Sequence, residues 1–385
     1  MPIGSSNTGD VGWSIRPTTV ELTGRRTVRE LTIDDIDDLA LGATLLGTGG
    51  GGDPYVGKLL VKQAIADHGP AKVVEPEELP SDGRLLTTAI IGAPTVILEK
   101  IPAGTEFRAG IRALAAYLGE EPVALMPIEV GGVNTLVPIA TAVEMGLPIV
   151  DADGMRRAFP QIEMTVFTLH GLLAAPMSIA DEKGNMCVFE ATTNQTAEAL
   201  ARAAVIQLGL ANAISCYPMT VADVQRAGIR GSMTYCTEVG RRLAHVKRGT
   251  DGAWQQLLDY TDAELVFSGK VIDIDRRTTE GFARGTVVLE HLDDTSRTMR
   301  VEIQNENLIA FEDGEAVVTV PDLLCLMDNE SADPVTTESL AYGQRLNVVA
   351  MPCAPEWHRD GMLELVGPRA FGYDIDYVDF RERRR

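Results

Sequence analysis

The feature that most constrains the fold is a regular alternation of apolar and amphipathic stretches over residues 84–150. Three short runs there are almost continuously apolar, as in strands that are buried on both faces. These runs are residues 84–92, 122–128 and 147–150. The intervening segments 105–118 and 134–145 have the apolar spacing of helices, and Asn134 is the expected cap of the second helix. Apolar strands joined by helices form parallel sheets, so the sequence predicts an α/β fold.

Changes of pattern along the 385 residues predict several domains, which the length itself favours. The first 27 residues are rich in Gly, Ser and Thr without a period, and we interpret them as a tail or an arm onto a neighbouring copy. After about residue 171 a hairpin and helices replace the alternation, and from about residue 264 strands and turns dominate. The expected organisation is an N-terminal tail (1–27), a parallel-sheet α/β domain with a glycine loop (28–171), a central α+β segment (172–260) and a C-terminal β-rich domain (261–385).

The composition argues against several classes of protein. With a net charge of −21, the chain has few ways to form the basic face that nucleic-acid binding requires. Its paired arginines, among them Arg156 and Arg157, are expected on solvated faces or at helix ends. No apolar stretch approaches the ~20 residues of a membrane helix, and the five cysteines form no C-x-x-C pair. We expect a cytoplasmic homo-oligomer without nucleic-acid or membrane partners.

The run Gly49-Gly50-Gly51-Gly52, followed by Asp53, is the least ordinary motif of the chain. Four consecutive glycines cost conformational entropy on folding, so they are expected where the backbone turns sharply or approaches another group closely. A helix is expected directly after them, and a loop before a helix N-terminus offers amide hydrogens to an anion or to a developing oxyanion. In the alternative, the run is a tight connection between two helices and binds nothing.

Acidic residues follow two of the predicted strands. Glu129 comes directly after the second strand, and Asp151 and Asp153 come after the third. In open parallel sheets, ligands bind beyond the carboxyl ends of the strands. Carboxyl groups that meet there can have their pKa values pushed apart, which supplies a base and an acid near neutral pH, so all three are candidate catalytic residues. In the alternative, the two aspartates cap turns and Glu129 pairs with Arg156 or Arg157.

A single divalent ion such as zinc is another way to organise this edge of the sheet. The five histidines form no H-x-H or H-E-x-x-H pattern, and His170 is of interest because it precedes a glycine at an expected domain junction. Asp151, Asp153 and His170 are the candidate ligands of an open site in which water completes the coordination. The spacing does not require a metal, so a mechanism without any cofactor is kept beside this one.

Five irregular motifs lie along the chain. They are residues 46–55 (LGTGGGGDPY), 129–134 (EVGGVN), 150–160 (VDADGMRRAFP), 321–324 (PDLL) and 366–373 (VGPRAFGY). In these motifs, and over nearly the whole chain after the tail, the sequence resembles the S-methyl thiohydantoin desulfurase family, which is associated with hydantoinase/oxoprolinase-type proteins. Two positions depart from the family pattern: Arg156 stands where glycine is usual, and Gln161 stands where glutamate is usual.

The resemblance implies hydrolysis of a small cyclic amide or thioamide, namely a thiohydantoin or its S-methyl derivative. Water would add to the ring carbon that bears sulfur, and sulfide or methanethiol would leave to give a hydantoin. Such chemistry needs a general base, donors for the tetrahedral intermediate and a positioned ring. We assign the base to Glu129 or Asp153, and the amide donors to Gly50, Gly51 and Gly52.

The expected substrate-binding residues combine the glycine loop with the start of the following helices. They are Gly49, Gly50, Gly51, Gly52, Asp53, Gly131, Gly132 and Asn134. If the glutamate replaced by Gln161 works in catalysis, the protein acts on another substrate or is inactive. In the alternative from a different class, the chain is a non-catalytic or auxiliary subunit of a hydantoinase/oxoprolinase-type complex. Turnover of a thiohydantoin by the purified chain alone separates the two.

Overall fold

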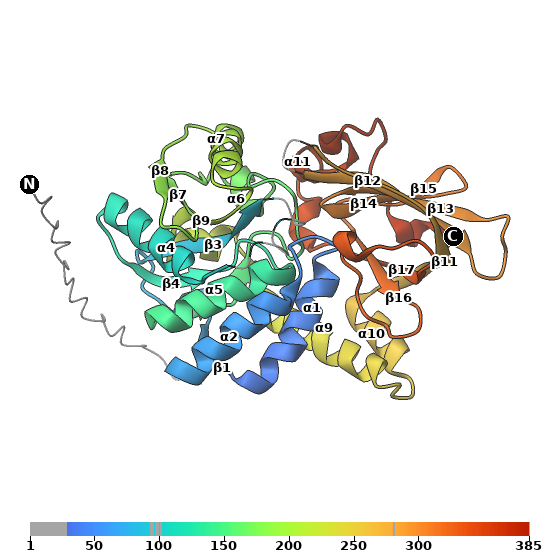
Figure 1. Ribbon diagram of the computed structural model, residues 1–385, viewed down its shortest axis with the longest axis horizontal. Helices are drawn as coiled ribbons and strands as arrows, with labels where there is room; N and C mark the ends of the chain where they lie inside the picture. The colour runs from blue at the N-terminus through green and yellow to red at the C-terminus, as the bar shows by residue number, and fades with distance from the viewer. Residues whose placement is uncertain (1–28, 93–95, 97–99, 101, 280–281, 385) are drawn as a thin grey trace, which may run out of the picture.

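The computed structural model describes residues 29–92, 96, 100, 102–279 and 282–384, and the expected tail over residues 1–27 lies outside this range. The molecule is built on two large sheets (Figure 1). Helices surround the sheet of the N-terminal half, and the strands of the C-terminal half lie at the other end of the molecule. The predicted α/β class with a β-rich C-terminal domain is confirmed.

The N-terminal sheet has eight strands in the order β1-β2-β5-β4-β3-β9-β7-β8. Their bounds are β1 (Arg29–Leu31), β2 (Ala71–Val74), β3 (Arg84–Gly92), β4 (Pro122–Met126), β5 (Ile149–Val150), β7 (Met177–Ala180), β8 (Met186–Phe189) and β9 (Ala211–Thr220). Strands β2, β5, β4 and β3 run parallel; the alternation predicted β3, β4 and β5, and β2 was not among the predicted strands. Strand β9 pairs antiparallel with β3, and β7 and β8 continue from it. The expected boundary at residue 171 therefore falls between strands of one sheet.

Helices of this half pack against the sheet and against one another. They are α1 (Ile36–Leu46), α2 (Pro54–His68), α4 (Thr105–Leu118), α5 (Gly132–Met145), α6 (Val166–Leu169), α7 (Asn194–Gln207), α8 (Val221–Ala227), α9 (Ser232–Lys247) and α10 (Ala253–Thr261). Helix α1 lies against α9, and α2 lies against α5 (Figure 1). A two-stranded sheet joins β6 (Ala152–Asp153) to β10 (Ile229–Arg230). Among the helices of the described residues, none is long and apolar enough to cross a membrane.

Strand β3 is the centre of the N-terminal core. Residues 85–91 are all buried, and because successive side chains of a strand point to opposite faces, β3 is covered on both. On one face, Ile90 packs with Phe107 of α4 and with Val133 and Val137 of α5. This arrangement fixes the carboxyl end of β3 against the start of α5.

The start of α5 differs from the prediction that Asn134 caps the helix. The helix begins at Gly132, with Gly131 in the cap position. Gly132 has a φ of +45°, and a Cβ there would lie only 2.0 Å from the carbonyl oxygen of Gly52, so the helix can start this close to the glycine loop only with glycine. Asn134 therefore lies inside the first turn, and its side chain bonds outside its own helix.

The C-terminal sheet has seven antiparallel strands in the order β15-β14-β13-β12-β11-β17-β16. Their bounds are β11 (Glu264–Thr279), β12 (Phe282–His291), β13 (Thr298–Gln304), β14 (Glu306–Glu312), β15 (Glu315–Thr319), β16 (Leu323–Asp328) and β17 (Arg345–Met351). One face carries a core of its own, which includes Val271, Leu289, Val301 and Val348. After β17 come the 3-10 turn η4 (Pro355–His358) and the short helix α11 (Met362–Val366).

Arg157 joins the two halves, contrary to the expectation of a solvated side chain. It is fully buried, and its guanidinium lies 4.2 Å from the ring centroid of Phe159. It donates hydrogen bonds to the carbonyl oxygens of Pro321 (2.6 Å) and Asp322 (2.9 Å), and to Thr48 Oγ1 (3.2 Å). The five N–H donors of a guanidinium suit a residue that links several backbone carbonyls at once.

Candidate active site

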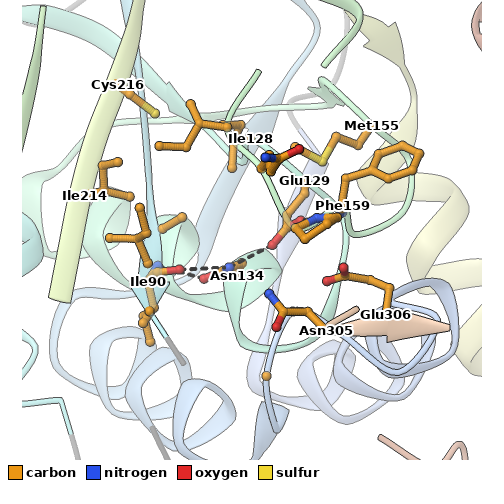
Figure 2. A pocket seen from close by; sticks show the side chains of 18 of the residues that line it. Ile90, Ile128, Glu129, Asn134, Met155, Phe159, Ile214, Cys216, Asn305 and Glu306 are labelled. Atoms are coloured by element: carbon orange, nitrogen blue, oxygen red, sulfur yellow. Dashed lines mark hydrogen bonds between the residues drawn. The ribbon is translucent and has the colours of Figure 1, made fainter. Parts of the chain in front are cut away.

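A pocket lies at the carboxyl ends of β3 and β4, the edge at which open α/β sheets bind ligands. The N-terminal half lines it with Ile90, Glu129 and Asn134, and the C-terminal half with Asn305 and Glu306 (Figure 2). Its cavity of about 80 Å³ compares with the ~10–15 Å³ that one water needs. The pocket therefore suits a small ligand rather than a nucleotide.

Glu129 is the predicted catalytic residue that lies in this pocket, and it is 5% exposed. Asn134 Nδ2 donates a hydrogen bond to Oε1 over 2.7 Å, and the Phe159 amide donates one to Oε2 over 3.3 Å. Burial outweighs these bonds and, together with the charge of Asp153, raises the pKa of Glu129 to about 7. This carboxyl group can therefore exchange a proton near neutral pH, which a general base must do.

Asn134 positions the Glu129 carboxylate. Its Oδ1 accepts a hydrogen bond from the Ile90 amide over 2.7 Å, and its Nδ2 donates to the Ile90 carbonyl oxygen over 3.2 Å. Figure 2 shows these bonds and the one to Glu129 as dashed lines. The side chain thus ties Glu129 to the end of β3, so the direction of the carboxylate is set by the sheet.

Glu306 is a second carboxyl group in the pocket, and it is 2% exposed. It follows Asn305, which has a φ of +58° at the reversal between β13 and β14, a conformation that Asn adopts more readily than most residues. Asn305 Oδ1 accepts a hydrogen bond from the Ala283 amide over 2.8 Å, which fixes this turn. Within the described residues, Glu306 Oε2 has no hydrogen-bond partner.

The two glutamates have different electrostatic environments. Both oxygens of Glu129 accept hydrogen bonds, as an ionised carboxylate does. Burial and, next, the charge of Glu129 raise the pKa of Glu306 well above its usual value, against an opposing effect of Arg157. Two neighbouring carboxyl groups that do not ionise together supply one base and one acid.

The glycine loop contributes to the pocket with only part of its length. Gly51 and Gly52 line the cavity, whereas Gly49 and Gly50 lie behind it. A Cβ on Gly50 would lie 2.0 Å from Glu306 Oε1, and one on Gly49 would also meet side chains of the C-terminal half. The loop is therefore both a wall of the pocket and the surface on which the two halves of the molecule meet.

The other expected binding residues lie beside the pocket. Gly131 and Gly132 pack against the glycine loop, where a Cβ on Gly51 would lie 2.5 Å from the Gly131 carbonyl group. Asp53 caps α2, because its Oδ1 accepts a hydrogen bond from the Tyr55 amide over 2.7 Å. These residues shape the backbone around the site and do not line it.

Asp151 and Asp153 are buried next to the pocket without lining it. Asp151 Oδ1 accepts hydrogen bonds from the amides of Met233 (2.8 Å) and Thr234 (3.1 Å) at the start of α9. Asp153 Oδ1 accepts one from Ser232 Oγ over 2.6 Å, and its Oδ2 accepts from three backbone amides. The three amides are those of Val130 (3.0 Å), Met155 (3.1 Å) and Arg156 (2.6 Å). Both carboxylates thus hold turns and a helix start together.

His170, the third predicted metal ligand, does not meet these aspartates. It lies between the guanidinium groups of Arg226 (3.5 Å from Nδ1) and Arg359 (3.4 Å from Nε2). Burial and these two charges lower the pKa of His170. Over the described part of the chain, Asp151, Asp153 and His170 do not converge on a common point as metal ligands would.

Two family models match consecutive parts of the chain. The model described as S-Me-THD-like, N-terminal domain, matches residues 34–191, and the model described as S-Me-THD-like, C-terminal domain, matches residues 192–380. The chain belongs to the S-Me-THD-like family. The resemblance to the S-methyl thiohydantoin desulfurase family is thereby confirmed over almost all of the chain that the structure describes.

The fold of this S-Me-THD-like chain is also similar to that of a solved structure. The X-ray crystal structure of a protein from Chromobacterium violaceum, a target of the Northeast Structural Genomics Consortium, superposes with a TM-score of 0.74. The two chains are 23% identical, and the match covers 91% of this chain and 99% of the other. At this identity the likeness concerns the fold alone. A comparison with curated proteins gave no match.

Sequence reasoning gave no role to Asn305 and Glu306, although a signal was present. The polar triplet over residues 305–307 directly precedes the apolar run 308–310, at positions that prove buried. The two departures from the family pattern also have a physical place. Gln161 lines the pocket, and Arg156 has a φ of +52°, a conformation in which glycine is the unstrained residue.

Proposed function

We propose that this S-Me-THD-like protein is a hydrolase that removes sulfur from a thiohydantoin or S-methyl thiohydantoin ring. The observation that carries the proposal is the pair of buried carboxyl groups, Glu129 and Glu306, in one small pocket at the strand ends. Family membership supports the substrate class. A small cavity that holds one base and one acid suits the addition of water to a small ring.

In this proposal Glu129 is the general base. Its carboxylate takes a proton from a water molecule as the water oxygen forms a bond to the ring carbon that bears sulfur. Asn134 holds Oε1 of the carboxylate, so Oε2, whose bond from the Phe159 amide is long at 3.3 Å, is the oxygen that faces this water. A pKa of about 7 lets the group take up and return the proton within each turnover.

Glu306 is the general acid of the same proposal. The bond between carbon and sulfur breaks, and the protonated carboxyl group gives its proton to the departing sulfur. With an S-methyl substrate, one proton of water ends on methanethiol and the other on the ring nitrogen. With a thiohydantoin, both protons end on sulfide. In either case the water oxygen becomes the carbonyl oxygen of the hydantoin. Glu129 passes the proton that it took from water to the ring nitrogen or to sulfur, and the hydroxyl proton of the intermediate goes to Glu306, so both carboxyl groups return to their starting states.

The glycine loop supplies the donors for the tetrahedral intermediate. Gly51 and Gly52 line the pocket beside the two carboxyl groups. Backbone amides that point at a developing negative charge stabilise it without any reorganisation, and the loss of one such donor typically costs ~10²–10³ in kcat. Gly52 has a φ of +77°, so a side chain at this position would strain the loop and narrow the cavity.

The proposal is tested with the purified chain, a thiohydantoin or its S-methyl derivative, and single amide substitutions. We expect Glu129→Gln and Glu306→Gln each to lower kcat by about 10²-fold or more, the usual effect of losing a general base or acid. The matched control is Glu163→Gln. Burial also raises the pKa of Glu163 to about 7, but this residue does not line the pocket, so its variant keeps the wild-type rate.

The pH profile adds a second measurement. Since the base acts ionised and the acid acts protonated, the wild-type rate should rise as the pH passes about 7 and fall again at higher pH. Glu129→Gln should remove the rising limb. Wild-type rates in both pocket variants would contradict the mechanism. No turnover by the purified wild-type chain, but turnover once a hydantoinase/oxoprolinase-type partner is added, would favour the auxiliary-subunit alternative.

A further inference from the structure

A second cluster of reactive side chains lies in the C-terminal half, outside the candidate active site. Among the described residues, Asp322, Cys353 and His358 each offer a ligand atom, and these three atoms lie within 4.8 Å of one another. Cys353 Sγ and His358 Nε2 are 3.3 Å apart. None of the three lines the pocket that contains Glu129. The cluster therefore requires an explanation of its own.

The sheet brings these residues together although they are distant in sequence. Asp322 directly precedes β16, Cys353 follows the end of β17, and the two strands pair at Leu323 and Met351. The amide of Cys353 donates a hydrogen bond to Asp322 Oδ1 over 2.9 Å. His358 ends the turn η4, which begins two residues after Cys353. The positions of all three side chains are thus set by regular backbone structure.

We propose that Asp322, Cys353 and His358 bind a zinc ion, with water in an open fourth position. Zinc takes sulfur at about 2.3 Å and nitrogen or oxygen at about 2.0–2.2 Å, so two ligands of a tetrahedral site lie roughly 3.5 Å apart. The 3.3 Å between Sγ and Nε2 has this spacing. A carboxylate, a thiolate and an imidazole are the three ligand types that zinc prefers.

Neighbouring residues support the ligands in the way that metal sites require. Tyr377 donates a hydrogen bond to Asp322 Oδ2 over 2.7 Å, and the Cys353 amide holds Oδ1, so the carboxylate is oriented by two donors. The Tyr377 ring also packs edge-on against the His358 ring at 5.5 Å. Asp322 and Cys353 are buried while His358 is exposed, which gives the ion a path from solvent.

Three positive side chains near the cluster have partners other than the three proposed ligand atoms. The Arg381 guanidinium, which lines the same surface cleft as Cys353, pairs with Asp379 over 2.9 Å and with Asp262 over 3.4 Å. Arg156, from the same cleft, stacks over the Tyr235 ring at 5.4 Å. Arg157, the third of these side chains, is bonded to the main-chain carbonyl oxygens of Pro321 and Asp322. The inference does not rest on the proposed desulfurase activity.

The test uses the full chain, freed of metal with a chelator and titrated with Co²⁺ alone, then with Zn²⁺ in competition. A cobalt–thiolate bond gives a charge-transfer absorption band. We expect one Co²⁺ per chain with this band, displaced by Zn²⁺. Cys353→Ser should abolish the band, and His358→Ala should weaken binding on the order of 10²-fold.

Cys187→Ser is the matched control, because Cys187 is the one cysteine of the described residues that is not fully buried. It should leave the band and the affinity unchanged. Since His358 is exposed, His358→Ala is not expected to disturb folding, and it keeps the test informative if Cys353→Ser folds poorly. Absence of a thiolate band in the wild type, or a band that survives both substitutions, overturns the proposal.

Discussion

Two buried carboxyl groups at the same sheet edge, those of Asp153 and Glu129, differ in their hydrogen bonds. Burial raises the pKa of Asp153 to about 6 and that of Glu129 to about 7, so the pKa alone does not distinguish them. Asp153 accepts hydrogen bonds from three amides and from the Ser232 hydroxyl, which leaves it no capacity for substrate. Glu129 lines the cavity, and its Oε2 accepts only one long hydrogen bond, from the Phe159 amide. Geometry therefore favours Glu129 as the base.

The raised pKa of Glu129 also predicts how stability depends on pH. Its folded-state pKa of about 7 lies above the ordinary 4.5, because burial disfavours the charged form. The group's contribution to the free energy of unfolding is full below about pH 4.5 and is lost as the pH rises through about 7. At ~1.4 kcal/mol per pKa unit, this loss is on the order of 3 kcal/mol. Glu129→Gln should remove it, as measured by urea unfolding across this pH range.

Glu238 is a control, because its pKa is shifted in the opposite direction to that of Glu129. Hydrogen bonds from Arg242 and Arg241 lower the pKa of Glu238 despite its partial burial. Glu238 therefore stabilises the fold above its ordinary pKa, and the effect is lost as the pH falls through its folded-state value. Glu238→Gln should reduce the pH dependence of the free energy of unfolding at acid pH and leave its pH dependence near neutral pH unchanged. A Glu129→Gln profile identical to that of the wild type would contradict the assigned environment of Glu129.

At the residue scale, the sequence predicted Glu129 but not its partner. Glu129 was found because strand order alone places residues after a buried strand at the ligand-binding edge. Glu306 comes from a strand reversal in the other half of the molecule, and nothing local indicates that this turn faces the first sheet. Asp151 and Asp153 satisfied the same edge rule, yet their side chains hold α9 and the neighbouring turns.

The glycine loop is the element on which the pocket depends most. It lies between α1 and α2, and its backbone meets both halves of the molecule: the Val133 amide donates to the Gly52 carbonyl oxygen over 3.2 Å, and the Thr337 amide donates to that of Gly49 over 2.9 Å. Since the backbone itself forms these contacts, side chains have no room. This accounts for four consecutive glycines better than either a simple turn or a ligand contact alone.

Gly50→Ala tests this account of the loop. The added methyl group would occupy a position 2.0 Å from Glu306 Oε1, so Glu306 must move out of the pocket or the loop must shift. We expect a loss of about 1–3 kcal/mol in the free energy of unfolding, the usual cost of overpacking, together with a strong loss of turnover. The free energies are measured by urea unfolding of the single variants and the double variant.

The Glu306→Ala background supplies the control. Glu306→Ala removes the side chain that the new methyl group would meet, so Gly50→Ala should cost clearly less stability there than in the wild type. Additive losses in this double-mutant cycle would mean that Gly50 is needed for another reason. In that case the position of the carboxyl group would not depend on the loop.

At the element scale, hydrophobic periodicity predicted most strands and helices because each buries a continuous apolar face. Helix α4 and strand β3 have the predicted bounds. The start of α5 was missed because a left-handed glycine, Gly132, begins the helix where a polar cap was expected. The pairing of β9 with β3 could not be predicted from local sequence pattern either, since the paired residues are more than a hundred positions apart in the sequence.

On the scale of the whole molecule, the pocket exists because the two halves are held in one arrangement, and an apolar core that includes Leu46, Leu323 and Met351 runs across their junction. Arg157 is a polar link between the halves, beside the backbone hydrogen bonds from Thr337 to Gly49 and from Asn307 to Thr48. Its charge is fully buried, and it is bonded to Thr48 from the glycine-loop segment and to the carbonyl oxygens of Pro321 and Asp322 from the C-terminal half. The sequence analysis placed this arginine on the surface, because a buried arginine is rare and its acceptors are backbone groups that no sequence pattern reveals.

Arg157→Met should therefore loosen the two halves. Methionine fills similar space but leaves the two carbonyl oxygens unsatisfied, and each buried acceptor without a donor typically costs about 1–3 kcal/mol. We expect that loss in urea unfolding. Tryptophan fluorescence, to which Trp357 at the junction contributes, should change before the far-ultraviolet circular dichroism, whereas in the wild type the two signals coincide. Arg242→Met, which removes a surface ion pair with Glu238, should change stability by less than about 1 kcal/mol. Coincident transitions and an equally small loss in Arg157→Met would show that apolar contacts alone join the halves.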